Sequence, residues 1–282
     1  MILSTDSTAN LPKELYTKHN IKMIPLQVIL DGEVYDDLSD QLPNKEFHDK
    51  MRNGTAPKTA QINAETAKAY FELLLNTGED VIHISFSSAL SGNTDTIIRI
   101  ANELNETHKN KVYVINSLQA SVGEGIIVLK ARELIDQNKK PQEIVDELNS
   151  FKHNVCAYFT VDQLKYLVRG GRVSKFSGVI GSILNIKPVL RVDEEGRLVS
   201  FKKVMSRKKS IAELANICCE KILDNKYLFI GHGDCIDDAN ALADMVEAKL
   251  GVRPTIVDIT QVICSHSGPG TLAIFFVSKA GK

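Results

Sequence analysis

The sequence predicts an α/β protein of two domains, with a parallel α/β sheet at residues 1–152 and an α+β domain with a mixed sheet at residues 153–282. In the first half, short apolar runs alternate with stretches whose apolar residues repeat at helical spacing, which is typical of parallel strands joined by helices. In the second half, a hairpin pattern occurs among such crossovers, which favours strands of mixed direction. The chain of 282 residues is long enough for both domains.

Strands and helices alternate through the first half. Strands are expected at residues 1–4, 23–30, 81–86 and 112–115, and Pro25 interrupts the second of them. Apolar residues at i, i+3, i+4 and i+7, or at similar spacings, predict helices over residues 67–74, 97–104 and 144–151 and after Ser121. Because ligands bind outside the carboxyl ends of parallel strands, we expect a site where residues 5–8, 87–93 and 116–123 meet.

The second half begins with a predicted strand at residues 155–160. Residues 187–192 and 197–204 flank Asp193-Glu194-Glu195-Gly196, which is a hairpin signal with glycine in the turn. Amphipathic helices are expected over residues 211–222 and 239–250, and strands over residues 227–231, 255–259 and 272–277.

Composition and charge exclude several classes of protein. The net charge of −1 argues against a general nucleic-acid binder, although residues 165–209 hold twelve Lys or Arg against three acids and so predict a basic surface. The five cysteines are odd in number and form no CxxC motif, which favours a reducing cytoplasm over a disulfide framework or a zinc site. No apolar run approaches the length of about 20 residues that a membrane-spanning helix needs, and no signal peptide is evident.

Residues 87–93 are the most informative stretch of the chain. An apolar run ends there in a group of donors, and a helical pattern follows. A loop that feeds a helix N-terminus binds anions, because its backbone N–H groups are unpaired. Ser87, Ser88, Ser91 and Asn93 add side-chain donors, and Gly92 allows the backbone to approach a ligand closely. The loop contains no base, acid or lysine, so it is suited to hold an anion rather than to transform it.

Several common motifs are absent or incomplete. Residues 268–273 fit the letters of a dinucleotide fingerprint, but a strand-like run follows them instead of a helix. The chain has no P-loop, no H-E-x-x-H and no G-x-S-x-G serine elbow. His232, Asp234, Asp237 and Asp238 are more typical of a strand end and a helix cap than of a metal site, and we expect neither a metal nor a cofactor.

Five separated segments rich in small, polar and glycine residues resemble one family. They are residues 4–8, 58–61, 87–93, 169–173 and 265–270. Together with the Ile-Lys-Pro segment at residues 186–188, they resemble the DegV family of bacterial fatty-acid-binding proteins, which includes the acyl-carrier subunits of bacterial fatty acid kinase. The resemblance runs from Asp6 to about Val277.

The resemblance implies that a long-chain fatty acid is buried between two α/β domains. It places the carboxylate on Thr59, Ser91 and His266, beside Gly92 and Asn93. It also implies that the bound acid is presented to a separate ATP-using kinase subunit, for which Arg172 and, more weakly, Arg207 would serve docking. We expect no integral membrane segment, and transient contact with a membrane surface is compatible with this role.

Donor chemistry agrees with this implied site. A carboxylate is acceptor-only, and two hydroxyls and an imidazole N–H supply the donors that it needs. The candidate tunnel residues, each of which is also compatible with an ordinary core position, are Ile62, Phe86, Phe159, Leu164, Ile183, Leu184 and Ile186. The sequence departs from the family pattern at Ala60, at Ile62-Asn63, at Asn93 and at Asn116-Ser117, which puts the acyl-chain preference in doubt.

Other interpretations of these residues stay open on the sequence alone. Thr59 and Ser91 are also suited to cap helices, and His266 beside a glycine turn is also compatible with a structural role. The alternative function is a serine-dependent acyl hydrolase in which Ser91 is the nucleophile, His266 the base and Asp6 the orienting acid. A DNA-associated protein is a third hypothesis, but neither a DNA-binding motif nor an aromatic platform supports it.

Overall fold

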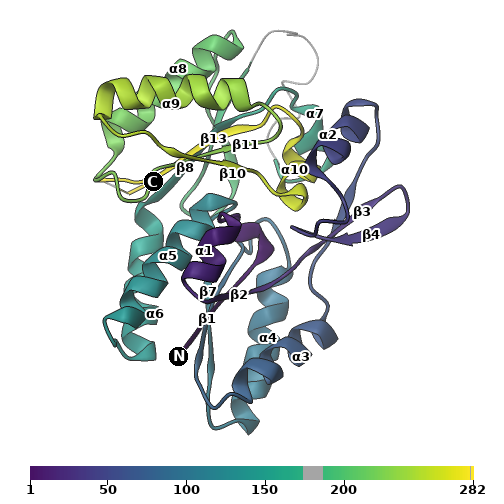
Figure 1. Cartoon of the computed structure of the whole chain (residues 1–282), viewed down its shortest axis with the longest axis vertical. Coiled ribbons are helices and arrows are strands. Elements are labelled where there is room, and N and C mark those ends of the chain that lie inside the picture. Colours follow the sequence, from purple (N-terminus) through teal and green to yellow (C-terminus); the bar gives the residue numbers. More distant parts are fainter. Residues whose placement is uncertain (174–186, 280) are drawn as a thin grey trace.

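The computed structural model describes residues 1–173, 187–279 and 281–282, and this part of the chain contains three sheets (Figure 1). The first sheet is parallel and has the order β2-β1-β6-β7, as expected for the first half. Its strands are β1 (Ile2–Asp6), β2 (Ile21–Ile24), β6 (Val81–Ser85) and β7 (Val112–Asn116).

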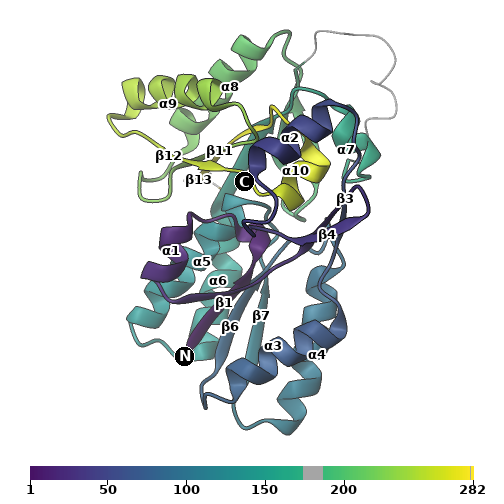
Figure 2. The same ribbon diagram turned by 45° about the vertical axis from the view of Figure 1, so that its right-hand side comes forward.

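Helices flank both faces of the parallel sheet. Helices α3 and α4 pack together on one side, and α5 and α6 pack together on the other, as the two views show (Figures 1 and 2). The helices of this half are α1 (Lys13–Lys18), α2 (Asn44–Arg52), α3 (Ala64–Leu75), α4 (Asn93–Thr107), α5 (Val122–Asp136) and α6 (Pro141–Phe151), with a short 3-10 turn at Ser7–Ala9.

The expectation of one strand over residues 23–30 is wrong. The chain leaves the parallel sheet after β2 and enters a separate antiparallel sheet of order β4-β3-β5. Its strands are β3 (Gln27–Leu30), β4 (Glu33–Asp36) and β5 (Lys58–Ala60). Proline fixes its own φ and lacks an N–H donor, so Pro25 separates the two strands. Asp31 and Gly32 then form the β3–β4 turn at φ +54° and +91°.

The third sheet is mixed, in agreement with the sequence, and has the order β10-β9-β8-β13-β11-β12. Strands β11 and β12 are parallel and the remaining pairs are antiparallel. The strands are β8 (Val155–Thr160), β9 (Val189–Val192), β10 (Leu198–Lys202), β11 (Phe229–His232), β12 (Thr255–Asp258) and β13 (Leu272–Val277). The predicted hairpin is present as β9–β10, with Gly196 at φ +78° in its turn.

The two faces of the mixed sheet have different partners. Tyr158 and Phe276 belong to a core that helices α8 and α9 cover, whereas Phe159 and Phe275 face the opposite way, toward α5. This alternation follows from the two-residue repeat of a strand. The helices of this half are α7 (Lys165–Arg169), α8 (Arg207–Lys221), α9 (Ile236–Leu250) and α10 (Gln261–Ser267), and a 3-10 turn covers Lys152–Asn154.

Helix α5 joins the two halves of the molecule. It contacts β1 and β6 of the parallel sheet and β8 and β13 of the mixed sheet. One apolar core therefore runs from Leu3 through Ile127 to Phe275. The predicted boundary at residue 152 coincides with the 3-10 turn before β8, but the two sheets share a core across it, so the boundary stays a prediction. In the described ranges no helix has the length and apolar character that a membrane crossing requires.

Candidate functional site

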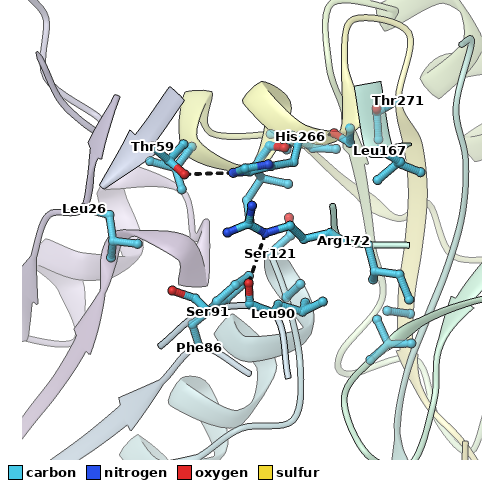
Figure 3. A pocket seen from close by; sticks show the side chains of 18 of the residues that line it. Leu26, Thr59, Phe86, Leu90, Ser91, Ser121, Leu167, Arg172, His266 and Thr271 are labelled. Atoms are coloured by element: carbon cyan, nitrogen blue, oxygen red, sulfur yellow. Dashed lines mark hydrogen bonds between the residues drawn. The ribbon is translucent and has the colours of Figure 1, made fainter. Parts of the chain in front are cut away.

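A cavity of about 440 Å³ lies between the mixed sheet and the loops at the carboxyl ends of the parallel strands (Figure 3). Its volume falls within the range of roughly 300–1,000 Å³ that is common for small-molecule sites. The inner face of the mixed sheet supplies one wall through Ala157, Phe159, Ala273 and Phe275. Thr59, Ser91 and His266, which are far apart in the sequence, all line the cavity.

Thr59 and His266 are joined directly. Thr59 lies on β5, and its Oγ1 is 2.8 Å from Nε2 of His266 on α10 (Figure 3). Strand β5 pairs with β3, where Thr59 stands opposite Val28, so the antiparallel sheet that the sequence did not predict holds this threonine in place. The alternative that Thr59 caps a helix is wrong, because Asn63 caps α3 and accepts the N–H of Thr66.

The surroundings of His266 keep its imidazole neutral. Burial, with a smaller effect from the positive charges of Arg172 and Arg169, lowers the pKa of His266 to about 4. Its second nitrogen, Nδ1, is buried without a hydrogen-bond partner among the described residues. Gly170 packs against this nitrogen so closely that a Cβ at residue 170 would lie 2.5 Å from it. Gly170 therefore leaves room for the histidine ring.

Ser91 lies at the beginning of α4. Its Oγ accepts the N–H of Asn93 at 3.2 Å, so Ser91 satisfies one backbone donor of the first turn. The N-cap residue itself is Gly92, so the alternative that Ser91 is the N-cap is wrong. A hydroxyl that accepts one hydrogen bond still has its own proton to donate. Ser91 can therefore support the helix and donate to a ligand at the same time. Gly92 also lines the cavity.

Asn93 is buried behind the loop rather than in the lining of the cavity. Its Nδ2 donates to Asp6 at 3.1 Å, and its Oδ1 accepts the N–H of Ile62 at 3.2 Å. Asp6 in turn accepts the N–H of Phe86 at 3.1 Å. Asn93 thus ties together the strand end, the loop and the segment after Thr59, and positions the residues that do line the cavity.

The two arginines predicted to serve docking lie in different surroundings. Arg172 lines the cavity, and its guanidinium lies between His266 and Ser91 (Figure 3). Arg207 lies at the start of α8, where its Nε donates to Asp238 at 2.8 Å. For both residues the docking role stays a prediction.

The candidate tunnel residues are also divided. Phe86 and Phe159 line the cavity. Ile62 is buried in the neighbouring core, and Leu164 packs against the core beneath the mixed sheet. Ile183, Leu184 and Ile186 lie outside the described residues.

The contacts of a serine hydrolase are not formed in the described part of the chain. The Nε2 of His266 contacts Thr59, and the contact of Ser91 Oγ is the N–H of Asn93. Asp6 is fully buried among Thr8, Ser85, Phe86 and Asn93, and so does not orient His266. A triad needs a base on the nucleophile and an acid on the base, and the described residues form neither contact.

The acidic cluster after β11 is paired with arginine and histidine. Asp234 forms an ion pair with Arg52 of α2, and Asp238 forms one with Arg207. Nε2 of His232 is 3.4 Å from Asp258. Within residues 1–173, 187–279 and 281–282, no group of three or more His, Cys, Asp or Glu side chains is arranged to hold a metal ion.

Sequence reasoning missed two parts of the site. The β3–β4 turn carries an Asp-Gly pair between Gln27–Leu30 and Glu33–Asp36, which is a strong hairpin signal and would have predicted the sheet that holds Thr59. Helix α10 carries Gln261, Cys264 and Ser265 on its buried side, and this mixed composition concealed it. No local signal places Arg172 in the cavity.

Comparison with known proteins agrees with the residues at this cavity. A family model described as "Uncharacterised protein, DegV family" matches residues 2–279. A DegV domain-containing protein of Clostridium perfringens is 36% identical, and the match covers 98% of this chain and 97% of that protein. The chain belongs to the DegV family.

Solved DegV structures share the fold over the whole chain. DegV of Bacillus subtilis, described as a fatty acid binding protein, is 32% identical and has a TM-score of 0.85 with 99% of each chain covered. A fatty acid binding DegV family protein of Streptococcus agalactiae is 28% identical, with a TM-score of 0.89 over 99% of this chain and 98% of that one. The parallel sheet and the mixed sheet are therefore arranged here as in other DegV proteins.

The departures from the DegV pattern fall at different depths around the cavity. Ala60 lines it, whereas Ile62 and Asn93 lie behind it. Asn116 holds the serine loop, because its Nδ2 donates to Ser88 Oγ at 2.7 Å. Of these changes, Ala60 has the most direct access to a bound molecule.

Proposed function

We propose that this protein binds a long-chain fatty acid in the cavity, with the carboxylate on the Thr59 and Ser91 hydroxyls beside His266 and the acyl tail along the mixed sheet. The observation that carries the proposal is the meeting of these three polar side chains in a cavity whose opposite wall is apolar. The Bacillus subtilis and Streptococcus agalactiae relatives, both described as fatty acid binding proteins, support it.

The polar side chains at one end of the cavity determine which end of the ligand binds there. With a proton on Nε2, His266 donates to Thr59, which leaves the Thr59 hydroxyl proton free for the carboxylate. Ser91 contributes a second hydroxyl from the other side of the cavity. His266 thus acts by positioning Thr59, and the two hydroxyls contact the ligand.

Burial of the tail supplies most of the affinity. Each buried methylene contributes about 0.8 kcal/mol, so a chain of roughly 15 methylenes gains on the order of 12 kcal/mol before the cost of association. Phe159 and Phe275 provide a broad apolar surface for it, and Ala157 and Ala273 leave space between them. The mixed sheet therefore determines how much of the tail fits.

Native mass spectrometry of freshly purified protein tests the proposal. We expect a non-covalent adduct with the mass of a fatty acid, which identifies the chain bound. After removal of the lipid, titration with palmitic acid should restore one adduct per chain. Protein that is always empty and takes up no fatty acid would show that the proposal is wrong.

We further propose that the protein is a non-catalytic carrier in the cytoplasm that presents the acid to an ATP-dependent kinase subunit. Among the residues that the structure describes, no base is hydrogen-bonded to Ser91 Oγ, which supports a carrier over a hydrolase. A fluorophosphonate probe should leave Ser91 unlabelled, and stoichiometric labelling would contradict this. Acyl phosphate formed from the loaded protein by a fatty acid kinase of the same organism, trapped with hydroxylamine, tests the partnership.

A further inference from the structure

Two carboxyl groups lie fully buried behind the loop that carries Ser91. Asp6 ends β1 and Glu124 belongs to the first turn of α5, and both are 0% exposed. The hydroxyl of Thr8 joins them, because its Oγ1 contacts Asp6 Oδ1 and also lies 2.9 Å from Glu124 Oε2. In the described part of the chain, the hydrogen bonds to these two groups come from hydroxyls, an amide and backbone N–H groups, and none comes from a cation.

The contacts of Thr8 require a proton on one of the two acids. The Thr8 hydroxyl has a single proton, which it can donate to Asp6 or to Glu124 but not to both. Two neighbouring carboxylates without a cation also repel each other, and a proton on one of them removes the repulsion. The protonated acid then donates to the oxygen of Thr8, and Thr8 donates to the remaining carboxylate.

The donors around Asp6 favour its ionised form. Its Oδ1 accepts the backbone N–H of Thr8 at 3.0 Å. Its Oδ2 accepts the N–H of Phe86 and the Nδ2 of Asn93, both at 3.1 Å. An N–H group cannot become an acceptor, so these contacts stabilise a carboxylate and offer no partner to a carboxyl proton.

The partners of Glu124 are hydroxyls, which can accept as well as donate. Its Oε1 lies 3.0 Å from Thr5 Oγ1, and Thr5 can instead donate to the carbonyl of Ile84, also at 3.0 Å. Burial raises the pKa of Glu124 well above its ordinary value, and the charge of Asp6 raises it further. Burial also raises the pKa of Asp6, but its N–H donors oppose this rise. Glu124 therefore holds the proton at neutral pH.

Asp6 is connected to the ligand site through Phe86 and Asn93. Phe86 lines the cavity and Asn93 begins α4, so the two residues stand on either side of the loop that carries Ser91. Asp6 Oδ2 accepts a hydrogen bond from each of them. Asn93 also accepts an N–H from the segment that follows Thr59. One buried oxygen therefore holds both ends of the serine loop.

From these contacts we propose that ionised Asp6 is a positioning residue of the ligand site, and that Glu124 carries the proton of the pair. The inference rests on the proposed function and adds what holds the Ser91 hydroxyl in place. Asp6 does not line the cavity and acts through Phe86 and Asn93. The two acids have different roles although one hydroxyl joins them.

Substitution of each acid by its amide tests the inference, because the two amides meet opposite surroundings. In Asp6→Asn, either orientation of the amide turns its NH₂ group toward an N–H donor, so palmitic acid should bind roughly tenfold more weakly. In Glu124→Gln, the NH₂ group takes over the donation to Thr8, so binding should stay within about threefold of wild type. Titration of lipid-free protein, counted by native mass spectrometry, measures both.

Two further measurements separate positioning from a general effect of removing an acid. Asp80 accepts the N–H of Lys111 at 2.8 Å at the opposite end of the parallel sheet, so Asp80→Asn should leave binding unchanged. The infrared absorption of protonated carboxyl groups at neutral pH reports the proton directly. It should lose intensity in Glu124→Gln relative to wild type.

A second variant covers the case in which Asp6→Asn does not fold. Asn93→Ala keeps both acids but removes the Nδ2 donor, and should weaken binding to a similar extent. An unchanged affinity in Asp6→Asn or Asn93→Ala, a loss in Glu124→Gln as large as in Asp6→Asn, or unchanged infrared absorption in Glu124→Gln would overturn the inference and leave the proposed function intact. Wild type that binds no palmitic acid would overturn the proposed function itself.

Discussion

At the scale of single residues, the site depends on a contact between side chains 207 positions apart in the sequence. Thr59 and His266 are only weak indicators of function when each is taken alone. Their 2.8 Å contact turns them into one unit, because a histidine that donates from Nε2 leaves the hydroxyl proton of the threonine free for a ligand. Single substitutions at these residues therefore test the proposed carboxylate site most directly.

Substitution of Thr59 tests the hydroxyl directly. Thr59→Val keeps the β-branched shape of the side chain but removes the donor, so we expect about tenfold weaker binding of palmitic acid. Thr59→Ser keeps the hydroxyl and should bind within about threefold of wild type. Titration of lipid-free protein measures both. Equal affinity of Thr59→Val and wild type would show that this hydroxyl does not contact the ligand.

The pKa of His266 predicts how stability depends on pH. Its pKa is lowered from 6.5 to about 4 in the folded protein, so the unfolded chain binds more protons between these values. The contribution of neutral His266 to the free energy of unfolding is complete above pH 6.5 and is lost as the pH falls toward 4. His266→Gln removes this dependence. Between pH 7 and pH 4.5 the free energy of unfolding should therefore fall by on the order of 2 kcal/mol less in the variant than in wild type.

Urea unfolding at the two pH values measures this change in the free energy of unfolding. His19→Gln, at a histidine outside the cavity lining, serves as the control and should follow the wild-type curve. If the free energy of unfolding changed equally with pH in wild type and His266→Gln, the assignment of a neutral, buried His266 would be contradicted.

At the scale of elements, the end of α7 shapes the site through two adjacent glycines. A Cβ at Gly170 would lie 2.5 Å from Nδ1 of His266, whereas a Cβ at Gly171 would meet no atom within 4 Å. Gly171 has φ +69°, a conformation that disfavours other residues, and Gly170 is helical at φ −71°. One glycine is therefore needed for packing and the other for backbone conformation.

Alanine at each glycine separates these two roles. Gly170→Ala should displace the His266 ring and weaken fatty acid binding by about tenfold, because Thr59 loses its partner. Gly171→Ala should cost about 1 kcal/mol of stability through its backbone and leave binding unchanged. Thermal unfolding and lipid titration of both variants check this. If Gly171→Ala lost fatty acid binding and Gly170→Ala kept it, the roles assigned to the two glycines would be reversed.

Elements with a regular pattern could be predicted from the sequence, and irregular ones could not. The periodicity of residues 97–104 predicted α4, and the run at 81–86 predicted β6. The short strand β5 pairs through three residues and shows no apolar alternation. Its position is fixed by β3, a neighbour distant in sequence, which is why the strand that carries Thr59 was missed.

At the scale of the whole molecule, one apolar core crosses the boundary predicted at residue 152. Leu3 of β1, Ile127 of α5 and Phe275 of β13 belong to the same cluster. Separate domains would each need a core of their own. The cavity lies along this shared interface, where the two halves contact each other directly.

We therefore expect the lipid-free protein to unfold in a single cooperative transition. Far-ultraviolet circular dichroism and tyrosine fluorescence should give coincident urea curves, because both halves lose the shared core together. Palmitic acid should shift the midpoint upward, since it binds the folded state. Two separated transitions in the lipid-free protein would show that the halves are stable independently.

The sequence by itself determined the class of both large sheets and most of their helices, because hydrophobic periodicity records which face of each element is buried. Its small polar segments also pointed to Thr59, Ser91 and His266, through their resemblance to one family. Only the tertiary structure decided that Arg172 lines the cavity, that Asn93 lies behind it and that Thr59 and His266 touch. Such contacts join residues far apart in the chain, and no local pattern records them.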